Sequence, residues 1–140
     1  MSGQTQRELD IISRSLEPLV FDTREFIAAI KNLVLSHRGR VRVVVLNPDT
    51  LVSRGGSRMV ELAIRLSSYI EIRSPGEIHR EFNEAMLIAD RLGVIHSENS
   101  ERYVGLANFH APRMAALLSE NFESIWHYAE NIPSFRRLML

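Results

Sequence analysis

The stretch Val41-Arg42-Val43-Val44-Val45-Leu46 decides the fold class of this 140-residue chain. Its run of β-branched residues predicts a strand that is buried on both faces, as in the middle of a sheet covered by helices. Two further strands are predicted before and after it in the sequence, over Leu9–Ser13 and Tyr69–Arg73. The segments that link these strands carry apolar side chains at helical spacing, which predicts a helix in each connection.

The two connecting helices have recognisable boundaries. The first is expected to begin at Asp22-Thr23-Arg24-Glu25, because an N-cap acid followed three residues later by glutamate is typical of a capping box. It is expected to end at Gly39, which would adopt the left-handed conformation that closes many helices. The second helix is expected to follow the loop at residues 54–58.

The second half of the chain predicts a hairpin and a long closing helix. The hairpin joins Ala85–Asp90 to Val94–His96, with its turn around residues 90–93. Pro112 predicts the start of the last helix, since proline is favoured in a first helical turn. The residues expected to pack from this helix onto the core are Met114, Leu117, Leu118, Phe122, Ile125 and Trp126. Strands that alternate with helices predict an α/β domain with a mixed β-sheet flanked by helices.

Length and composition narrow the class of protein. We expect a single domain over residues 1–140, with a core at about 8–130 and a C-terminal tail at 131–140. The absence of cysteine excludes a disulfide framework, a thiolate zinc site and a cysteine nucleophile. No apolar run approaches the roughly 18 residues of a membrane span, and the polar start is unlike a signal peptide. A cytoplasmic location without membrane contact is therefore expected.

The charge balance bears on the expected partners. The chain has 17 basic and 17 acidic side chains, and this balance argues against a general binder of polyanions such as nucleic acid. Lys31 is the only lysine, so the other basic residues are all arginine, which suits bidentate binding of phosphate or carboxylate. Schiff-base chemistry would depend on Lys31, which lies within a predicted helix, and it is not expected.

The order of elements and several phrases resemble one half of the phospholipase D-like fold. The phrases are Arg54–Arg58, Ile70–Arg73, Ala85–Asp90 and Tyr103–Phe109, and the resemblance covers about residues 8–130. The chain is similar to divergent bacterial phospholipase D-like domains of unknown function, some of which are joined to acetyltransferase-like domains. Active members of the wider family carry His-x-Lys, four more residues and Asp, followed downstream by Gly-Ser-x-Asn.

The residues at these motif positions depart from the active pattern. Asp90 matches the aspartate, but Asn83 stands at the histidine position and Ala85 at the lysine position. Gly105 and Asn108 match the outer residues of the second motif, whereas its serine is missing and the gap from Asp90 is longer than usual. The family's mechanism needs the histidine to attack phosphorus and the lysine to stabilise the charge that develops. The resemblance therefore implies a pseudo-enzyme in which no residue is catalytic.

A glycine-rich loop before the second connecting helix is the main candidate for ligand binding. It combines a flexible backbone, two guanidinium groups and a helix start, which together suit phosphate. An ordinary solvated helix entry fits the same residues. The predicted phosphate-binding set is Arg54, Gly55, Gly56, Ser57, Arg58 and Asn108.

Three more residues are candidates for a site. His79 lies in a polar stretch with Glu81 and Glu84, where acid–base chemistry competes with an exposed loop. The chain lacks the His-Glu-x-x-His spacing that places metal ligands on one helical turn, so neither a metal nor a cofactor is expected. At Asp90, a turn-capping role competes with the family role of orienting the histidine. His110 precedes the last helix, where its side chain can cap backbone groups.

The leading interpretation is a non-catalytic phospholipase D-like domain that acts as a binding or assembly module. The resemblance implies that the site of this fold lies between two similar halves, so we expect a homodimer whose cleft binds a phosphate ester or a nucleotide. One alternative is a phosphodiesterase or nuclease with a rebuilt active site that uses His79 or His110. Another is a regulatory domain that binds a different protein, such as an acyltransferase-like partner.

Overall fold

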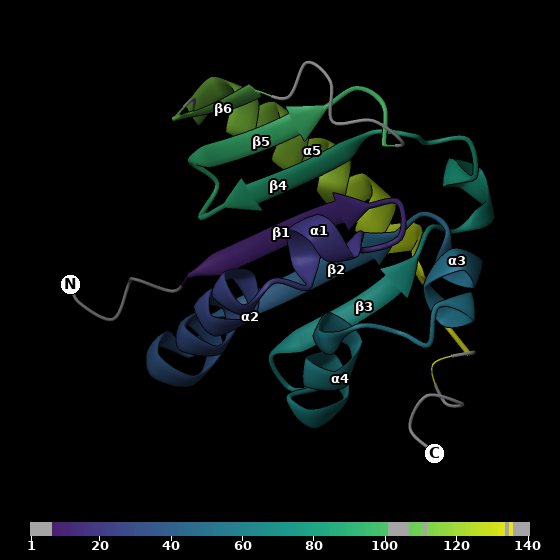
Figure 1. The fold of residues 1–140 in the computed structure, drawn as a ribbon. Coiled ribbons are helices and arrows are strands. Elements are labelled where there is room, and N and C mark those ends of the chain that lie inside the picture. The colour runs from purple at the N-terminus through teal and green to yellow at the C-terminus, as the bar shows by residue number, and fades with distance from the viewer. Residues whose placement is uncertain (1–6, 101–106, 111, 134, 136–140) are drawn as a thin grey trace.

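The computed structural model describes residues 7–100, 107–110, 112–133 and 135. A seven-stranded mixed sheet, in the order β6-β5-β4-β1-β2-β3-β7, forms its centre (Figure 1). β1, β2 and β3 are parallel, while β4 runs antiparallel to β1 and continues into the antiparallel strands β5 and β6. The strands are β1 (Glu8–Ser13), β2 (Arg40–Val45), β3 (Ile70–Ser74), β4 (Ala85–Ala89), β5 (Gly93–Ser97), β6 (Ala107–His110) and β7 (Glu130–Asn131).

The helices lie in the connections that the sequence predicts. A π-helical turn at Asn32–Ser36 extends α2, and a short 3₁₀ turn at Glu77–His79 follows β3. The α-helices are α1 (Pro18–Phe21), α2 (Arg24–Lys31), α3 (Pro48–Ser53), α4 (Arg58–Arg65) and α5 (Pro112–Tyr128). The α/β class with a mixed sheet flanked by helices is confirmed.

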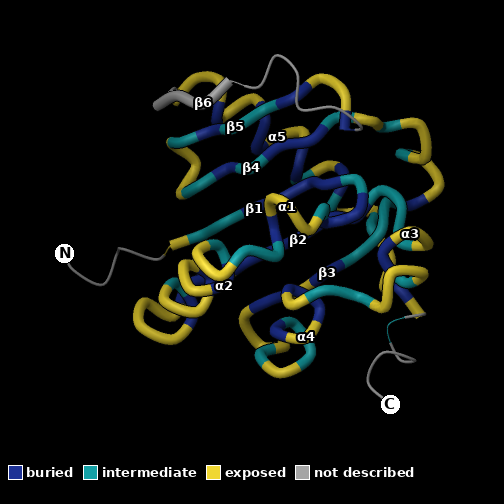
Figure 2. The backbone as a smooth tube through the Cα atoms, in the orientation of Figure 1, coloured by how far each residue is buried: buried dark blue, intermediate teal, exposed yellow. Residues whose placement is uncertain are grey.

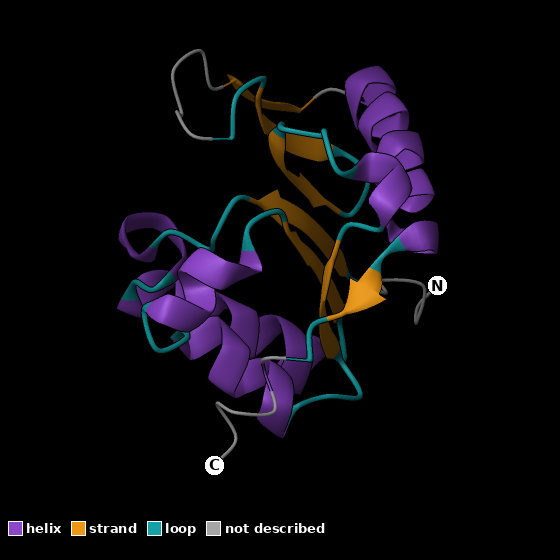
Figure 3. Ribbon diagram, turned by 90° about the vertical axis from the view of Figure 1, so that its right-hand side faces the viewer, coloured by secondary structure: helices purple, strands orange, loops and turns teal. Residues whose placement is uncertain are grey.

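Two hydrophobic cores lie on the two faces of the sheet. On one face, α2 and α4 pack against β1–β3, and on the other face α5 packs against β4, β5 and the neighbouring strands (Figures 1 and 3). Val43 of β2 belongs to the first core and Val44 to the second, so β2 is buried on both faces as predicted (Figure 2). On the face opposite α5, residues of α1 lie beside β4 and β5, and residues of α2 lie beside β4. The helices on this side of the sheet are seen in Figure 3.

The start of α2 differs from the predicted capping box by one residue. Thr23 is the N-cap, and its hydroxyl accepts a hydrogen bond from the Phe26 amide at 3.1 Å. Asp22 instead ends α1, and its carboxylate accepts a hydrogen bond from the Arg58 amide at 3.0 Å. The prediction of Asp22 as the cap was wrong because the short helix α1 occupies the residues just before it.

The end of this helix also differs from the prediction. Arg38, with φ of 51°, adopts the left-handed conformation expected at Gly39. Gly39 is required for a different reason, since a Cβ at this position would lie 2.7 Å from the Leu33 side chain and 3.0 Å from the Arg7 carbonyl oxygen. The glycine therefore allows a close approach between chain segments, and Arg38 carries the backbone strain.

α5 begins at Pro112 as predicted, but its buried stripe is narrower than expected. Leu118, Phe122 and Ile125 are buried against the sheet. Met114 and Leu117 are 37% and 55% exposed, so the prediction that they pack onto the core was wrong. The buried stripe of α5 includes residues 115, 118, 122 and 125. Met114 and Leu117 each precede a residue of this stripe by one position, so their side chains lie beside the stripe and not within it.

The core continues beyond residue 130, into the segment expected to be a tail. Asn131 of β7 pairs with Arg73 of β3, Ile132 is buried, and Phe135 packs against the larger core. Among the described residues, no helix has the length and apolar character needed to cross a membrane.

Candidate functional site

Three segments meet at one edge of the sheet. β1 ends at Ser13, β4 begins at Ala85, and β5 ends at Ser97. Met86 pairs with Ile12, and Ala85 pairs with Ser97, so these ends lie side by side. The residues just beyond the ends of the strands, at 14, 83 and 98–100, are therefore brought together at this edge.

Asn83 forms the centre of a hydrogen-bonded cluster at this edge. Its side-chain oxygen accepts hydrogen bonds from the Ser100 hydroxyl at 2.5 Å and from an Arg14 guanidinium nitrogen at 3.2 Å. The Ser100 amide donates to the Asn83 carbonyl oxygen at 2.8 Å, and Ser100 is fully buried. Asn83 itself is exposed, so the cluster lies at the surface and is attached to the interior through the buried Ser100.

The two motif positions have little capacity for nucleophilic chemistry. A carboxamide such as that of Asn83 has no basic lone pair comparable to that of an imidazole, so it does not attack phosphorus. Ala85 is buried with 4% exposure and carries no charge to stabilise an oxyanion. The polar cluster can donate and accept hydrogen bonds, which suits binding.

A histidine–carboxylate pair lies next to this cluster, because Glu84 follows Asn83 and His96 is on the neighbouring strand β5. His96 Nε2 lies 2.7 Å from Glu84 Oε1, and the two side chains are 19% and 39% exposed. His96 pairs with Met86, whose side chain belongs to the core under α5, so His96 lies on that face of the sheet. Such a pair is one component of acid–base catalysis. Among the described residues, no group of three or more histidine, aspartate or glutamate side chains is placed to hold a metal ion.

Asp90 has a structural partner at the start of the sheet. Its φ is 54°, and Oδ1 accepts a hydrogen bond from the Glu8 amide at 2.7 Å. The next residue, Arg91, also has a positive φ, and the Leu92 amide donates to the Ala89 carbonyl to close the turn. This geometry gives Asp90 a turn-capping role between β4 and β5.

The backbone amides of the glycine-rich loop have acceptors within the chain. Gly55 and Gly56, both with positive φ, donate to the carbonyl oxygens of Val52 and Leu51. The Ser57 hydroxyl caps α4 by accepting from the Val60 amide. No open cradle of main-chain donors is present at these positions.

The two arginines of this loop have different surroundings. The guanidinium of Arg54 donates to the carbonyl oxygens of Ser15 and Leu16 at 2.7 and 3.0 Å, and so ties the loop to the end of β1. The Arg58 side chain lines a groove between α2 and α4. The guanidinium of Arg54 therefore holds the loop to the main chain, whereas that of Arg58 lies in a surface groove.

The remaining candidate residues lie apart from this loop. Asn108 and His110 are in β6, opposite Ile95 and Gly93 of β5, and their side chains lie outside the described part of the structure. β6 is one edge strand of the sheet, whereas the loop lies on the β2–β3 side, so Asn108 does not meet Arg54 or Arg58 within one chain (Figure 1).

His79 and the second motif complete the predicted set. The His79 ring packs at 5.9 Å from the Tyr128 ring, and its buried Nδ1 has no hydrogen-bond partner among the described residues. Gly105 lies outside the described residues.

A buried ion cluster lies between the sheet and α5, away from the motif positions. Arg42 donates to the Asp10 carboxylate at 2.9 and 3.1 Å and to the Glu123 carboxylate at 3.0 and 2.6 Å. Its guanidinium carbon lies 5.0 Å from the centre of the Phe122 ring. Burial raises the pKa of Asp10, while hydrogen bonds from Arg42 lower the pKa of Glu123. The only sequence signal for this cluster is a charged residue inside an otherwise β-branched strand.

Comparisons with known proteins agree with this architecture. A family model described as a domain of unknown function (DUF7931) matches residues 1–138. The structure of NucT from Helicobacter pylori resembles this one with a TM-score of 0.57 and 14% sequence identity, over 89% of this chain and 82% of that chain. No curated protein sequence matches the chain. The mixed sheet flanked by helices has a phospholipase D-like fold, and at this identity the likeness to NucT concerns the fold alone.

Proposed function

This chain belongs to the DUF7931 family, whose function is unknown, and we propose that it is a non-catalytic phospholipase D-like domain that serves as a binding and assembly module. One observation carries the proposal. The residue at the position of the family's nucleophile is Asn83, whose side-chain oxygen is already held by Ser100 and Arg14. The position of the family's lysine is Ala85, which is buried and uncharged.

In this proposal Ser100, rather than Asn108, takes the place of the asparagine of the second family motif. Ser97 and Ser100 have the spacing of the first and fourth residues in Gly-Ser-x-Asn, and they follow Asp90 without the long gap that Gly105 requires. Ser100 also contacts Asn83 through both its hydroxyl and its amide. Both motifs are thus degenerate, and together they form a polar surface suited to binding a phosphate ester or nucleotide without cleavage.

Assembly through pairing of two copies is the second part of the proposal. The face of β4–β6 opposite α5 is bordered by an apolar cavity of about 200 Å³ that is lined by side chains of α1, β1, β4 and β5. Leu19 of α1 is 92% exposed and Val20 is 43% exposed beside it. An exposed apolar surface next to the motif residues supports a symmetric homodimer in which two such surfaces cover one another.

A phosphodiesterase is the alternative that one observation favours. The 2.7 Å contact between His96 and Glu84 provides a carboxylate-bound imidazole near the motif positions. In that case His96, rather than His79 or His110, would be the residue to test first. The surroundings of His79 include the Tyr128 ring and no hydrogen-bond partner for its Nδ1 among the described residues.

Hydrolysis of bis(p-nitrophenyl) phosphate separates the two functions. The non-catalytic proposal expects no product above a buffer blank from the purified chain, from His96→Ala and from Glu84→Gln. Turnover by the unmodified chain that is lost in His96→Ala would overturn the proposal and support the alternative. His127→Ala is the matched control, because His127 is an exposed histidine at the far end of α5.

A further inference from the structure

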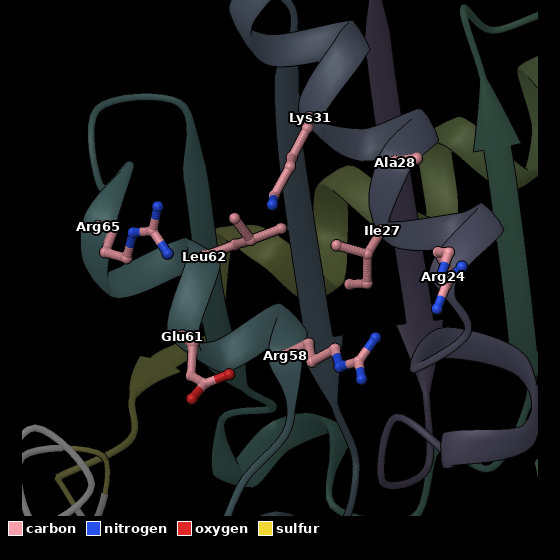
Figure 4. Close-up of a pocket in the computed structure, with 8 residues that line it drawn as sticks. All are labelled: Arg24, Ile27, Ala28, Lys31, Arg58, Glu61, Leu62 and Arg65. Carbon is pink, nitrogen blue, oxygen red and sulfur yellow. The ribbon is translucent and has the colours of Figure 1, made fainter.

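A strongly basic groove lies between α2 and α4. It has a volume of about 350 Å³, and basic side chains lie along both of its walls. The residues that line it are Arg24, Ile27, Ala28, Lys31, Arg58, Glu61, Leu62 and Arg65 (Figure 4). Four cations therefore face a single carboxylate, in a chain whose formal net charge is zero.

The four cations have no ionic partners among the described residues. None of the hydrogen bonds or salt bridges within the described part of the chain involves the side chain of Arg24, Lys31, Arg58 or Arg65, and all four residues are exposed. Figure 4 shows Arg58 extending from α4 towards Arg24 on α2, with the Lys31 ammonium pointing into the space between the helices. Cations that line one groove repel one another, so a bound anion would stabilise the folded chain.

The positions of these cations on their helices follow a regular pattern. α2 and α4 each return the chain between two parallel strands, so the two helices run in the same direction. Arg24 and Arg58 begin the helices, and Lys31 and Arg65 end them. Seven residues of helix separate the two pairs by about 10 Å. The groove thus presents one pair of cations at each end.

Arg24 and Arg58 occupy positions that the helices themselves disfavour. The first turn of a helix carries a partial positive charge, so basic residues there are destabilising unless an anion lies nearby. The Asp22 carboxylate binds the Arg58 amide, but neither guanidinium forms an ion pair with it. An external anion would offset both the helix dipoles and the repulsion between the side chains.

We propose that this groove binds a compact anion that carries two or more phosphate groups. Two pairs of cations at opposite ends suit phosphates joined in series better than a single phosphate. The floor of Ile27 and Leu62 is almost fully buried, which leaves little apolar surface for a peptide side chain. This site goes beyond the proposed non-catalytic function, because it lies on the helices α2 and α4 and none of its lining residues belongs to the Asn83 cluster.

Isothermal titration calorimetry with inorganic pyrophosphate at low ionic strength tests the proposal. Binding is expected, and Arg24→Gln, Lys31→Gln, Arg58→Gln or Arg65→Gln should each weaken it about three- to fivefold, the upper part of the range for one exposed ion pair. The double variant Arg24→Gln/Arg58→Gln should lose about tenfold, and Glu61→Gln should bind more tightly. The matched control is Arg38→Gln/Arg113→Gln, which removes two exposed arginines outside the groove and should bind normally.

Several results would overturn this assignment. Absence of saturable heat with pyrophosphate at two temperatures, together with absence of a shift in melting temperature on adding it, would exclude the site. Equal losses in the control double variant would show a general charge effect. Orthophosphate or sulfate binding as tightly as pyrophosphate would exclude a requirement for linked phosphates. Asn83→Ala should leave pyrophosphate binding unchanged. If the groove does not bind pyrophosphate, the non-catalytic proposal is therefore unaffected. If the chain proves to be catalytic, the proposal of an anion site in the groove is likewise unaffected.

Discussion

Arg42 links the sheet to the helix α5, which packs against one of its faces. It is 6% exposed, and its guanidinium joins the carboxylates of Asp10 on β1 and Glu123 on α5. Removing one member of a buried ion pair leaves its partner charged and without a counter-ion, which costs about 3–5 kcal/mol. Asp10 would be the stranded group, because it is 3% exposed.

We therefore expect Arg42→Met to lower the free energy of unfolding by about 3–5 kcal/mol. Urea denaturation followed by circular dichroism measures the change. Arg40→Met is the control, because Arg40 forms an exposed pair with Glu8 and should cost less than about 1 kcal/mol. Similar losses in the two variants would contradict a special role for the buried cluster. Adding Asp10→Leu to Arg42→Met should restore much of the stability.

Glu123 gives the same cluster a dependence on pH. Hydrogen bonds from Arg42 lower its pKa below the ordinary value of 4.5. A lowered folded-state pKa stabilises the fold fully above the pKa of the unfolded chain, and this contribution disappears as the pH falls through the folded-state value. Asp10 acts in the opposite direction, because burial raises its pKa and its ionisation becomes costly as the pH rises.

The free energy of unfolding of the Glu123→Gln variant should consequently fall less steeply with decreasing pH than that of the unmodified chain. Since the Glu123 side chain is 44% exposed, its loss at neutral pH should be below about 1 kcal/mol. Urea titrations at several pH values between about 3 and 7 cover the window in which Glu123 becomes protonated. An identical slope in the variant would show that other carboxylates carry the acid dependence.

At the scale of elements, the turn after α2 makes a separate prediction. Arg38 has φ of 51°, a conformation that costs a side-chain-bearing residue about 1–2 kcal/mol. Arg38→Gly should therefore raise the free energy of unfolding by about 0.5–1 kcal/mol, after the extra freedom of glycine in the unfolded chain is deducted. Thermal and urea denaturation both report this gain.

The neighbouring glycine provides the opposing test. Gly39→Ala should destabilise the chain, because the added Cβ would meet Leu33 and the Arg7 carbonyl at 2.7 and 3.0 Å. Gly39→Ala would also be destabilising if Gly39 held the left-handed conformation expected from the sequence, so Arg38→Gly is the variant that separates the two assignments. A destabilising Arg38→Gly would contradict the left-handed conformation of Arg38.

The same turn illustrates what the sequence predicts well and where it falls short. Val41–Leu46 predicts a strand buried on both faces because hydrophobic periodicity reports burial directly. Whether Arg38 or Gly39 takes the left-handed conformation depends on Leu33 and Arg7, which approach only in the folded chain. Boundaries and caps depend on such tertiary contacts, while the order and type of the elements depend mainly on local pattern.

The candidate sites show the same division. Asn83 and Ala85 can be identified from the motif spacing alone, because that spacing is local. The contact between Asn83 and Ser100 depends on the pairing of β4 with β5, so spacing pointed instead to Asn108. The groove between α2 and α4 has a signal in the sequence, since basic residues recur seven positions apart in each helix, but only the fold brings the two helices together.

At the scale of the whole molecule, charge and apolar surface are distributed unevenly. The equal totals of basic and acidic residues conceal a groove with a large excess of cations between α2 and α4. The apolar cavity beside α1 is lined by residues of α1, β1, β4 and β5. α1 lies on the same side of the sheet as α2 and α4 (Figure 1). Net charge alone therefore says little about which ligands the individual surfaces accept.

The exposed apolar surface beside β4 and β5 leads to the prediction about assembly. We expect a concentration-independent homodimer with twice the chain mass of 16.0 kDa, measured by light scattering during size-exclusion chromatography. Leu19→Glu should produce a monomer, because burying a charge against an apolar partner surface is unfavourable. Leu117→Glu is the matched control, since Leu117 is an exposed leucine on α5, on the opposite side of the sheet. A monomer at every concentration, or a dimer that Leu117→Glu disrupts and Leu19→Glu leaves intact, would exclude pairing through this surface. If the chain is a monomer, no second copy completes the Asn83 cluster. Ligand binding would then be measured with the single chain, and a different protein would be sought as the partner.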